Sequence, residues 1–300
     1  MFSKIASLRQ FTRDTARLVS ERVRNKGWWP GWILLETRVL DFLIHQANKR
    51  PLRRRVECPC CGWTGYDFMT FEAVYFWKRS SFCPRCESQD RQRLLNLYIT
   101  RRHPELFSGP MTLLHVAPGT LEKKLIFRNP QVNYLSTDCD FDEVKLRKLE
   151  RSRGRRTAST DYDLDEAERY VRHGRGFCGD IQDLALASQA VDIVFCIHVL
   201  EHVRNPNAGL SEVARVLRPG GTAYIMVPFE AGLPKSVEWD EPNPDIFDHI
   251  WNYSQNDFKD RLADFEYEEI VPASFLSPAE RSRYRIDDTE VIYRCVKPSG

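Results

Sequence analysis

Four cysteines stand in two pairs with the spacing of metal ligands. Cys58 and Cys61 lie in a CPCC sequence, and Cys83 and Cys86 lie in a CPRC sequence. Turns of this kind aim two thiolates at one tetrahedral Zn²⁺, so the four cysteines predict a structural zinc site. Cys60 is an alternative ligand, although its spacing to Cys61 is shorter than such a turn uses. Four ordinary buried cysteines are the other interpretation, which paired CxxC spacing disfavours.

A second group of polar residues follows the apolar run VDIVFCI: His198, Glu201 and His202. Their HxxEH order matches a zinc-protease pattern, but that pattern requires a helix, and the β-branched run predicts a strand that ends just before His198. A neutral imidazole, with a pKa near about 6.5, is suited to act as a general base. His198 and His202 are therefore candidate catalytic bases. The alternative is a histidine that only ties down the loop.

Alternating elements must position these side chains. The run 191–197 is followed by a helical stretch that Pro-Gly-Gly ends at residue 221, and then by a second apolar run at 222–227. Such a strand–helix–strand unit is typical of a parallel sheet. An earlier apolar run, 112–117, leads through a Pro-Gly turn into another helix. The predicted fold class is α/β, with a doubly wound sheet whose carboxyl edge carries the polar residues.

The order of these motifs resembles a known family. A CPRC pair, a charged helix, the sequence LLHVAPGTLEKKL and the later LEH are similar to the class I, Rossmann-like S-adenosylmethionine-dependent methyltransferases, in particular a bacterial subgroup with an N-terminal zinc-ribbon-like segment. The resemblance covers roughly residues 56–297. It implies a seven-stranded sheet preceded by a small zinc ribbon, and S-adenosyl-L-methionine as the cofactor.

The resemblance also implies where the cofactor is held. Its methionine portion is expected at the turn that contains His115, Ala117 and Gly119, although Ala117 stands where the family has a glycine and His115 replaces the usual acid. Asp138, at the end of the second strand, is expected to bind the ribose hydroxyls. Asp140 is the alternative ribose ligand.

Two further segments complete the expected site. Asp180 would accept a hydrogen bond from the adenine amino group and Ile181 would cover the ring, with helix capping as the alternative role for Asp180. His198 lies on the cofactor side, and His249 is a further candidate base beside the substrate. In ubiquinone-pathway O-methyltransferases with an LEH sequence, this segment holds a divalent ion. Here His198 replaces the first acid of that pattern.

The front of the chain is basic. Residues 1–55 carry thirteen Lys and Arg against four Asp and Glu, a net charge of +9, around a GWWPGW elbow at 27–32. This amphipathic arm suits an anionic membrane or a nucleic acid, and packing on its own protein or a dimer mate is the alternative. The predicted domains are the arm at 1–55, a zinc-ribbon-like module at 56–90 and the methyltransferase domain at 91–300.

Composition limits where the protein acts. No apolar run of eighteen residues and no secretory signal are evident, so we expect a cytoplasmic protein with peripheral membrane contact as an option. The predicted function is methyl transfer from S-adenosylmethionine to an O or N nucleophile of a small molecule or glycan precursor. One alternative is a zinc-containing rRNA or tRNA methyltransferase, whose arm would hold phosphates. A non-catalytic zinc-binding scaffold with the same fold is the other.

Overall fold

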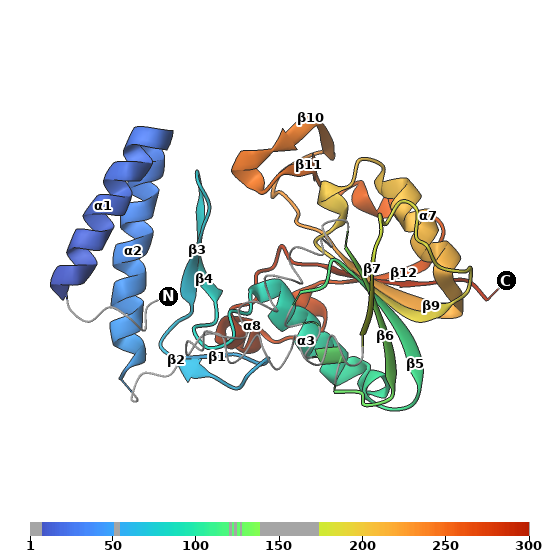
Figure 1. Cartoon of the computed structure of the whole chain (residues 1–300). Helices are drawn as coiled ribbons and strands as arrows, with labels where there is room; N and C mark the ends of the chain where they lie inside the picture. The colour runs from blue at the N-terminus through green and yellow to red at the C-terminus, as the bar shows by residue number, and fades with distance from the viewer. Residues whose placement is uncertain are drawn as a thin grey trace. The chain divides into compact units, whose positions relative to one another are not determined.

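The computed structural model describes most of the chain (Figure 1). The described residues are 8–50, 55–119, 122, 125, 126, 128–138 and 174–299. Asp140, the alternative ribose ligand, lies outside them, as do residues 139 and 141–173.

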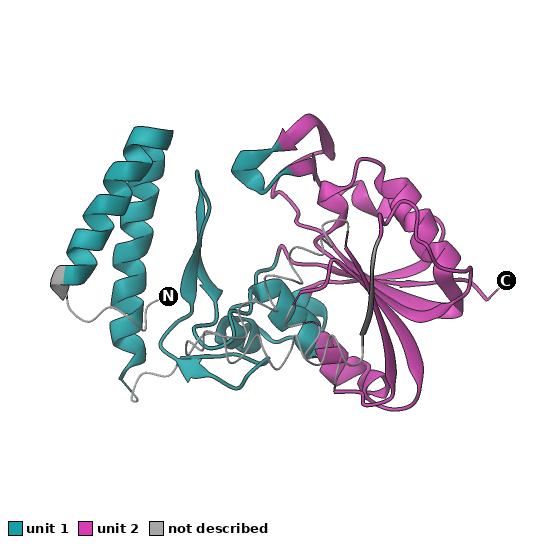
Figure 2. Cartoon of the chain, viewed as in Figure 1, with its two compact units in different colours: residues 1–97, 243–248, 272–288 teal, residues 98–242, 249–271, 289–300 magenta. Residues whose placement is uncertain are grey.

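The chain divides into two compact units (Figure 2). The first contains residues 1–97, 243–248 and 272–288, and the second contains residues 98–242, 249–271 and 289–300. This division differs from the three predicted domains, because two short C-terminal segments belong with the arm and the cysteine segment.

Two helices form the N-terminal part of the first unit: α1 (Leu8–Lys26) and α2 (Trp28–Asn48). Gly27 separates them with a φ of 94°, which glycine adopts without steric cost. Phe11 of α1 stacks on Phe42 of α2 at a ring-centroid distance of 4.6 Å. Gly31 permits close approach of the helices, because a Cβ at this position would clash with Val23. The arm is therefore a packed helical hairpin.

Short strands surround the cysteine pairs. β1 (Val56–Glu57) and β2 (Thr64–Gly65) pair on either side of the first cysteine pair, and β3 (Met69–Glu72) and β4 (Trp77–Phe82) form the antiparallel hairpin that leads to the second. Helix α3 (Asp90–Arg102) follows, and the short α8 (Pro278–Tyr284) returns to the same unit.

Arg93 explains why residues 272–288 belong to the first unit. Its side chain is fully buried. The guanidinium donates hydrogen bonds to the carbonyl oxygens of Ser81 and Ser88 beside the second cysteine pair, and to those of Tyr284 and Arg285 at the end of α8. Because a buried cation is costly without such acceptors, these contacts fix the C-terminal segment to the cysteine segment.

The second unit is built on a mostly parallel sheet, as the strand–helix–strand pattern predicted. The strand order is β12-β13-β9-β8-β5-β6-β7, and only β13 runs antiparallel to its neighbours. The strands are β5 (Met111–Val116), β6 (Val132–Asp138), β7 (Gly174–Cys178), β8 (Val191–Ile197), β9 (Leu217–Met226), β12 (Glu266–Ile270) and β13 (Ile292–Val296).

Both faces of this sheet are covered. Leu114 and Val194 face a core that includes Val213 of α7 (Pro206–Val216). On the opposite face, Tyr224 contacts Tyr98, from the last turns of α3, at a ring-centroid distance of 6.4 Å. The remaining elements are the pair β10 (Val237–Asn243) and β11 (His249–Asn252) and the short 3-10 helices η3 (Pro104–Phe107), η4 (Leu200–His202), η5 (Pro244–Ile246), η6 (Phe258–Leu262) and η7 (Pro272–Ser274).

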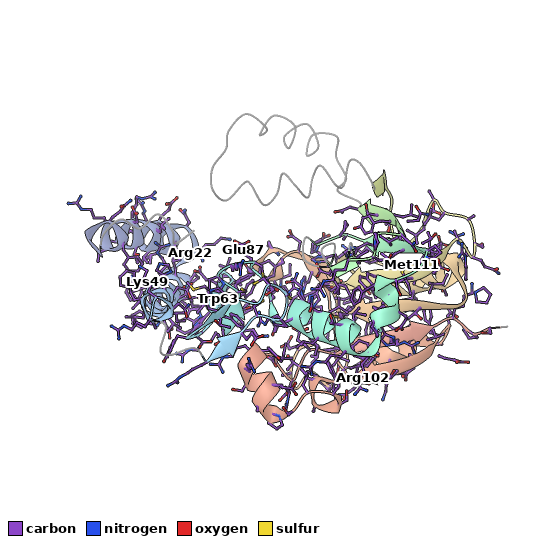
Figure 3. The ribbon with its side chains drawn as sticks, turned by 90° about the horizontal axis from the view of Figure 1, so that it is seen from below. Arg22, Lys49, Trp63, Glu87, Arg102 and Met111 are labelled. Carbon is purple, nitrogen blue, oxygen red and sulfur yellow. The ribbon has the colours of Figure 1, made fainter. Side chains whose placement is uncertain are left out.

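Figure 3 shows the side chains of the described residues. It labels Arg22 on α1 and Lys49 after α2, Trp63 and Glu87 in the cysteine segment, and Arg102 and Met111 at the end of α3 and the start of β5. No described helix combines the length and the apolar character needed to cross a bilayer.

Candidate functional site

Four neighbouring parallel strands bring the predicted cofactor residues to one edge. β8, β5, β6 and β7 lie side by side in this order, and His198, the turn at Gly119, Asp138 and Asp180 follow or end these strands. Ligands bind at this carboxyl edge in open α/β sheets, where the order of the strands reverses. The reversal here lies between β8 and β5.

The turn after β5 has the backbone of a glycine turn without its first glycine. Ala117 has a φ of 45°, and its N–H donates to the carbonyl oxygen of Thr137 on β6 at 2.7 Å. A left-handed conformation costs a residue with a Cβ about 1–2 kcal/mol. The sequence departs from the family at this position, but the backbone takes the shape that a glycine would take.

Glu122, a residue that the sequence reasoning did not single out, lies beside this turn. It is 4% exposed, and its Oε2 atom has no hydrogen-bond partner among the described residues, which leave out 120, 121, 123 and 124. A Cβ at Gly119 would collide with this oxygen, so the carboxylate of Glu122 occupies space that a side chain at position 119 would fill. A buried carboxylate oxygen without a donor is costly, which suggests that a cationic group completes it. The spacing of Glu122 from the Pro-Gly turn was the available signal.

Asp138 and Asp180 lie at the ends of adjacent strands. Asp138 is half-buried at the end of β6, and its carbonyl oxygen accepts from the N–H of Gly179, the residue before Asp180. Asp180 is exposed, and its carboxylate accepts from the backbone N–H and the side-chain amide of Gln182 at 2.9 and 2.8 Å. No helix is assigned to residues 181–190, so these contacts form a local turn and not the helix cap of the alternative interpretation. A carboxylate has lone pairs left for a further donor.

His115 and Ile181 are core residues in this structure. His115 is 1% exposed, and its Nδ1 lies 3.1 Å from the hydroxyl of Tyr134. Its ring also packs edge-on against Phe195. Ile181 is buried in the core on the α7 face, against Gly209. His115 thus has a hydrogen bond and ring packing in the core, and the described contacts of Ile181 are packing contacts.

The half-buried His198 pairs with the buried Glu201 just after β8. His198 has a φ of 55°, and its Nδ1 lies 3.4 Å from Glu201 Oε1. Burial alone would raise the pKa of Glu201, but the hydrogen bond and charge of His198 outweigh burial, and the pKa lies below its usual range. On the other side of the ring, Nε2 lies 4.0 Å from Glu290 Oε2. The ring therefore has a carboxylate near each of its nitrogens, and the one at Nδ1 orients the imidazole.

The remaining two candidate histidines also meet at Glu201. The rings of His202 and His249 lie 4.8 Å apart in an edge-to-face arrangement. Donor atoms of Glu201, His202 and His249 lie within 4.8 Å of one another, so this trio could hold a divalent ion. Within the part of the chain that the structure describes, the second oxygen of Glu201, Oε2, has no hydrogen-bond partner. Glu201 and His202 belong to the short η4 rather than an α-helix, which argues against the zinc-protease interpretation.

The segment after β9 packs against η4, which carries Glu201 and His202. Tyr253 is fully buried, and its hydroxyl donates to the carbonyl oxygen of Leu200 at 2.9 Å, which fixes η4. A cavity of about 240 Å³ lies next to it, and Thr289 in its wall precedes Glu290, the neighbour of His198. The cavity is lined mostly by polar groups: Glu230, Ser254, Gln255, Asn256 and Thr289, with Phe229 and Leu233.

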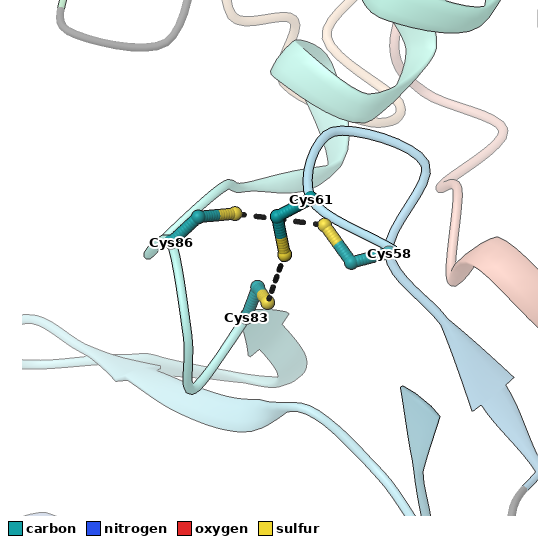
Figure 4. A group of neighbouring side chains, drawn as sticks. All are labelled: Cys58, Cys61, Cys83 and Cys86. Carbon is teal, nitrogen blue, oxygen red and sulfur yellow. Dashed lines mark hydrogen bonds between the residues drawn. The ribbon is translucent and has the colours of Figure 1, made fainter. Parts of the chain in front are cut away.

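The two cysteine turns in the first unit have the same backbone (Figure 4). The N–H of Cys58 donates to the carbonyl oxygen five residues later and its carbonyl accepts from the N–H of Gly62, and Cys83 repeats both bonds, the second with Glu87. Gly62 and Glu87 occupy equivalent positions with φ values of 70° and 60°. The sequence spacing therefore produces two matching turns that present their sulfurs to each other.

The four sulfurs have the separations of a tetrahedral site. Cys58 Sγ lies 3.6 Å from Cys86 Sγ, and Cys61 Sγ lies 3.7 Å from Cys83 Sγ. All four lie within 4.8 Å of one another, and this group does not include Cys60. Four ligands about 2.3 Å from one Zn²⁺ would be about 3.8 Å apart.

The charges of the cysteine group favour a cation. Hydrogen bonds from Cys60, Cys83 and Cys86 lower the pKa of the Cys58 thiol, whereas the hydrogen bond to Cys58 raises that of Cys83. Burial raises the pKa of Cys61 to about 12. Ionisation of one thiol thus opposes ionisation of its neighbours, and a metal ion would be needed to hold all four as thiolates.

Comparison with known proteins gives a consistent family signal. Residues 142–225 match the family described as a methyltransferase domain. A protein of Mycolicibacterium smegmatis (strain ATCC 700084 / mc(2)155), named "Probable S-adenosylmethionine-dependent methyltransferase", is 30% identical over 137 residues, which are 40% of this chain and 51% of that protein. The chain thus spans about half the length of this relative.

Solved structures with similar architecture are more distant. The 4+2 cyclase SpnF has a TM-score of 0.46 at 17% identity, over 70% of this chain and 81% of that one. The YcgJ protein of Bacillus subtilis has a TM-score of 0.44 at 15% identity, over 69% and 99% of the two chains. At this level of similarity neither structure bears on activity. The sequence comparisons thus give a similarity to methyltransferases, over residues 142–225 for the family and over 137 residues for the relative.

Proposed function

We propose that this chain transfers the methyl group of S-adenosylmethionine to an O or N nucleophile of a small molecule, such as a sugar or another glycan precursor. One observation carries the proposal: the turn at Gly119, Asp138, Asp180 and His198 follow or end four adjacent parallel strands. Such an edge can hold an elongated nucleoside ligand, with an imidazole near its reactive end.

The residues present fit this cofactor. The left-handed turn at Ala117 and the bare backbone of Gly119 suit the methionine portion, and the orphaned oxygen of Glu122 suits its ammonium group. Asp138 would accept hydrogen bonds from the ribose hydroxyls, and Asp180 would accept one from the adenine amino group. His115 and Ile181 would support this site from the core.

Catalysis then requires alignment and one base. The cofactor supplies a methyl group that its sulfonium already activates, so the protein mainly holds the reactants in line. His198 is the preferred base, because it directly follows β8 at this edge of the sheet and Glu201 orients its ring from the Nδ1 side. His202 and His249 are the other candidate bases, or with Glu201 the ligands of a divalent ion.

The polar cavity beside Tyr253 supports a small hydrophilic acceptor. Hydroxyl, amide and carboxylate groups line most of its volume of about 240 Å³. Such groups match the hydroxyls of a sugar-like molecule. A structural Zn²⁺ at Cys58, Cys61, Cys83 and Cys86 is the second part of the proposal, supported by the sulfur separations.

Isothermal titration calorimetry with S-adenosylmethionine tests the proposal. We expect saturable binding, displaced by S-adenosylhomocysteine, and at least about tenfold weaker binding by Asp138→Ala, because a hydrogen bond to a charged group contributes about 1.5–3 kcal/mol. Asp260→Ala changes an exposed aspartate of η6 and is the matched control. Absence of binding would favour the scaffold alternative. An untargeted screen for products that gain one methyl group would then identify the acceptor.

A further inference from the structure

Helix α2 carries an exposed apolar face. Trp28, Trp32, Val39 and Leu43 follow one another at helical spacing, and Trp29 lies at the edge of the same face. We call these five residues the apolar stripe. Their exposed fractions are 74% for Trp28, 60% for Trp29, 48% for Trp32, 42% for Val39 and 58% for Leu43. Exposed apolar patches of this kind usually mark interaction sites.

The other faces of α2 already have partners. Towards β3, Thr37 donates to Glu72 at 3.0 Å, and Asp41 accepts from the N–H of Thr70 at 2.8 Å. Towards α1, Phe42 stacks on Phe11. The apolar stripe is therefore a third face of the helix, distinct from the two that stabilise the first unit.

Cations lie at both ends of the stripe rather than within it. Arg24 and Lys26 precede α2, and Lys49 and Arg50 follow it, all of them exposed. Glu36, half-buried, is the acid on this side of the helix. The segment 1–55 as a whole has a net charge of +9.

The position of the cations relative to the apolar stripe distinguishes between three candidate partners. A second copy of the chain would bring two segments of net charge +9 together, which costs electrostatic free energy. A nucleic acid would contact cations, but the stripe contains none and would stay exposed to water. An anionic bilayer satisfies both features, because tryptophan and leucine enter the boundary below the headgroups while flanking cations meet the phosphates.

We propose that the α1–α2 hairpin docks on an anionic lipid bilayer, with the apolar stripe of α2 lying in the plane of the interface. The binding is peripheral: the stripe covers one side of α2, whose other sides hold Thr37, Asp41 and Phe42 in packing contacts. This inference does not depend on the methyl-transfer proposal. It places the bound enzyme beside acceptors that are attached to, or made at, a membrane surface.

Co-sedimentation of the full-length protein with vesicles tests the inference. The vesicles are pure phosphatidylcholine, or phosphatidylcholine with about 30% phosphatidylglycerol. We expect binding to the anionic vesicles that falls with added salt, and at least a tenfold lower partition coefficient for the triple substitution Trp28→Ala, Trp29→Ala and Trp32→Ala. The exchange of Lys49 and Arg50 for Glu should weaken binding to anionic vesicles selectively.

Tyr267→Ala is the matched control, since Tyr267 is an aromatic residue 43% exposed on β12 of the second unit. Equal thermal unfolding of all variants would show that the stripe is not needed for folding. A wild-type protein that stays in solution, or triple and control variants that sediment alike, would overturn the proposal. So would a dimer in light scattering that the triple variant dissociates without any lipid binding, or salt-sensitive binding to RNA alone.

Discussion

Replacing one cysteine of the four-cysteine group should remove a metal ion and much of the stability of the first unit. The substitution is Cys83→Ser, and its matched control is Cys60→Ser. Cys83 lies 3.7 Å from Cys61 within the group of four, whereas Cys60 is outside that group and its sulfur faces the carbonyl oxygen of Gln92 at 3.7 Å. Comparison of the two substitutions therefore distinguishes the loss of a metal ligand from the loss of a nearby thiol that is not a ligand.

The expected magnitude follows from how little else holds this segment together. β1 and β2 have two residues each, and β3 has four. Binding of a structural Zn²⁺ contributes on the order of 10 kcal/mol to folding, which is comparable with the whole stability of a typical domain. Removal of the metal should therefore unfold the cysteine segment, and Cys83→Ser should weaken zinc affinity by at least about 100-fold, or about 2.7 kcal/mol.

Metal analysis and thermal unfolding measure both effects. The protein purified from zinc-supplemented medium should contain one Zn²⁺ per chain by mass spectrometry, as should Cys60→Ser. Cys83→Ser should lose the metal to a weaker chelator than the wild type requires. Its first unit should melt at a lower temperature, while calorimetric binding of S-adenosylmethionine by the second unit reports whether that unit remains folded.

Two results would refute this reasoning. One is a metal content near zero in protein that is fully folded and stable in the presence of a chelator. The other is equal loss of zinc in Cys60→Ser and Cys83→Ser, which would show that the ligand set is not the one that the sulfur separations indicate.

Three further predictions concern the fold around the two sites. Ala117→Gly should raise the free energy of unfolding by about 1 kcal/mol in denaturant titrations, because glycine adopts the φ of 45° without strain; a decrease would show that the methyl group packs usefully. Burial raises the pKa of Asp41 from 3.8 to about 6, so the folded state binds this proton more tightly, and the contribution of Asp41 to stability falls as the pH rises from about 4 to about 6. The free energy of unfolding of Asp41→Asn should therefore rise relative to that of the wild type over this pH interval, by a total on the order of 3 kcal/mol at pH 7. Melting temperatures that change with pH in parallel for the two proteins would contradict this. Tyr253→Phe should cost about 1–3 kcal/mol in thermal unfolding by leaving the buried Leu200 carbonyl without its donor, and an unchanged melting temperature would show that water replaces it.

The sequence predicted the parts of the fold that depend on local pattern. The apolar runs at 112–117 and 191–197 are strands β5 and β8 of a mostly parallel sheet, because strands covered on both faces are apolar throughout. The spacing of the cysteine pairs likewise indicated which four sulfurs would meet. In both cases the information lies within a few consecutive residues.

Long-range contacts escaped the sequence reasoning. Nothing near Arg93 in the chain indicates that its guanidinium binds the carbonyl oxygens of Tyr284 and Arg285, and these contacts assign residues 272–288 to the first unit. The position of Glu122 was not predicted either, because its burial beside Gly119 depends on tertiary packing around the turn. Such features follow from tertiary packing, which residue spacing does not encode.

The turn after β5 also shows how a divergent motif can keep its physical properties. His115 stands where the resemblance leads one to expect an acid, and its imidazole is buried between Tyr134 and Phe195, where an ionised carboxylate would be costly to desolvate. A carboxylate is present all the same, because Glu122 places one beside Gly119 from the following helix, with an oxygen that lacks a donor. The backbone shape persists in the same way, through the left-handed Ala117. The described residues of this segment therefore combine a left-handed backbone at Ala117 with a carboxylate beside Gly119, although the sequence has neither the glycine nor the acid at the positions that the resemblance leads one to expect.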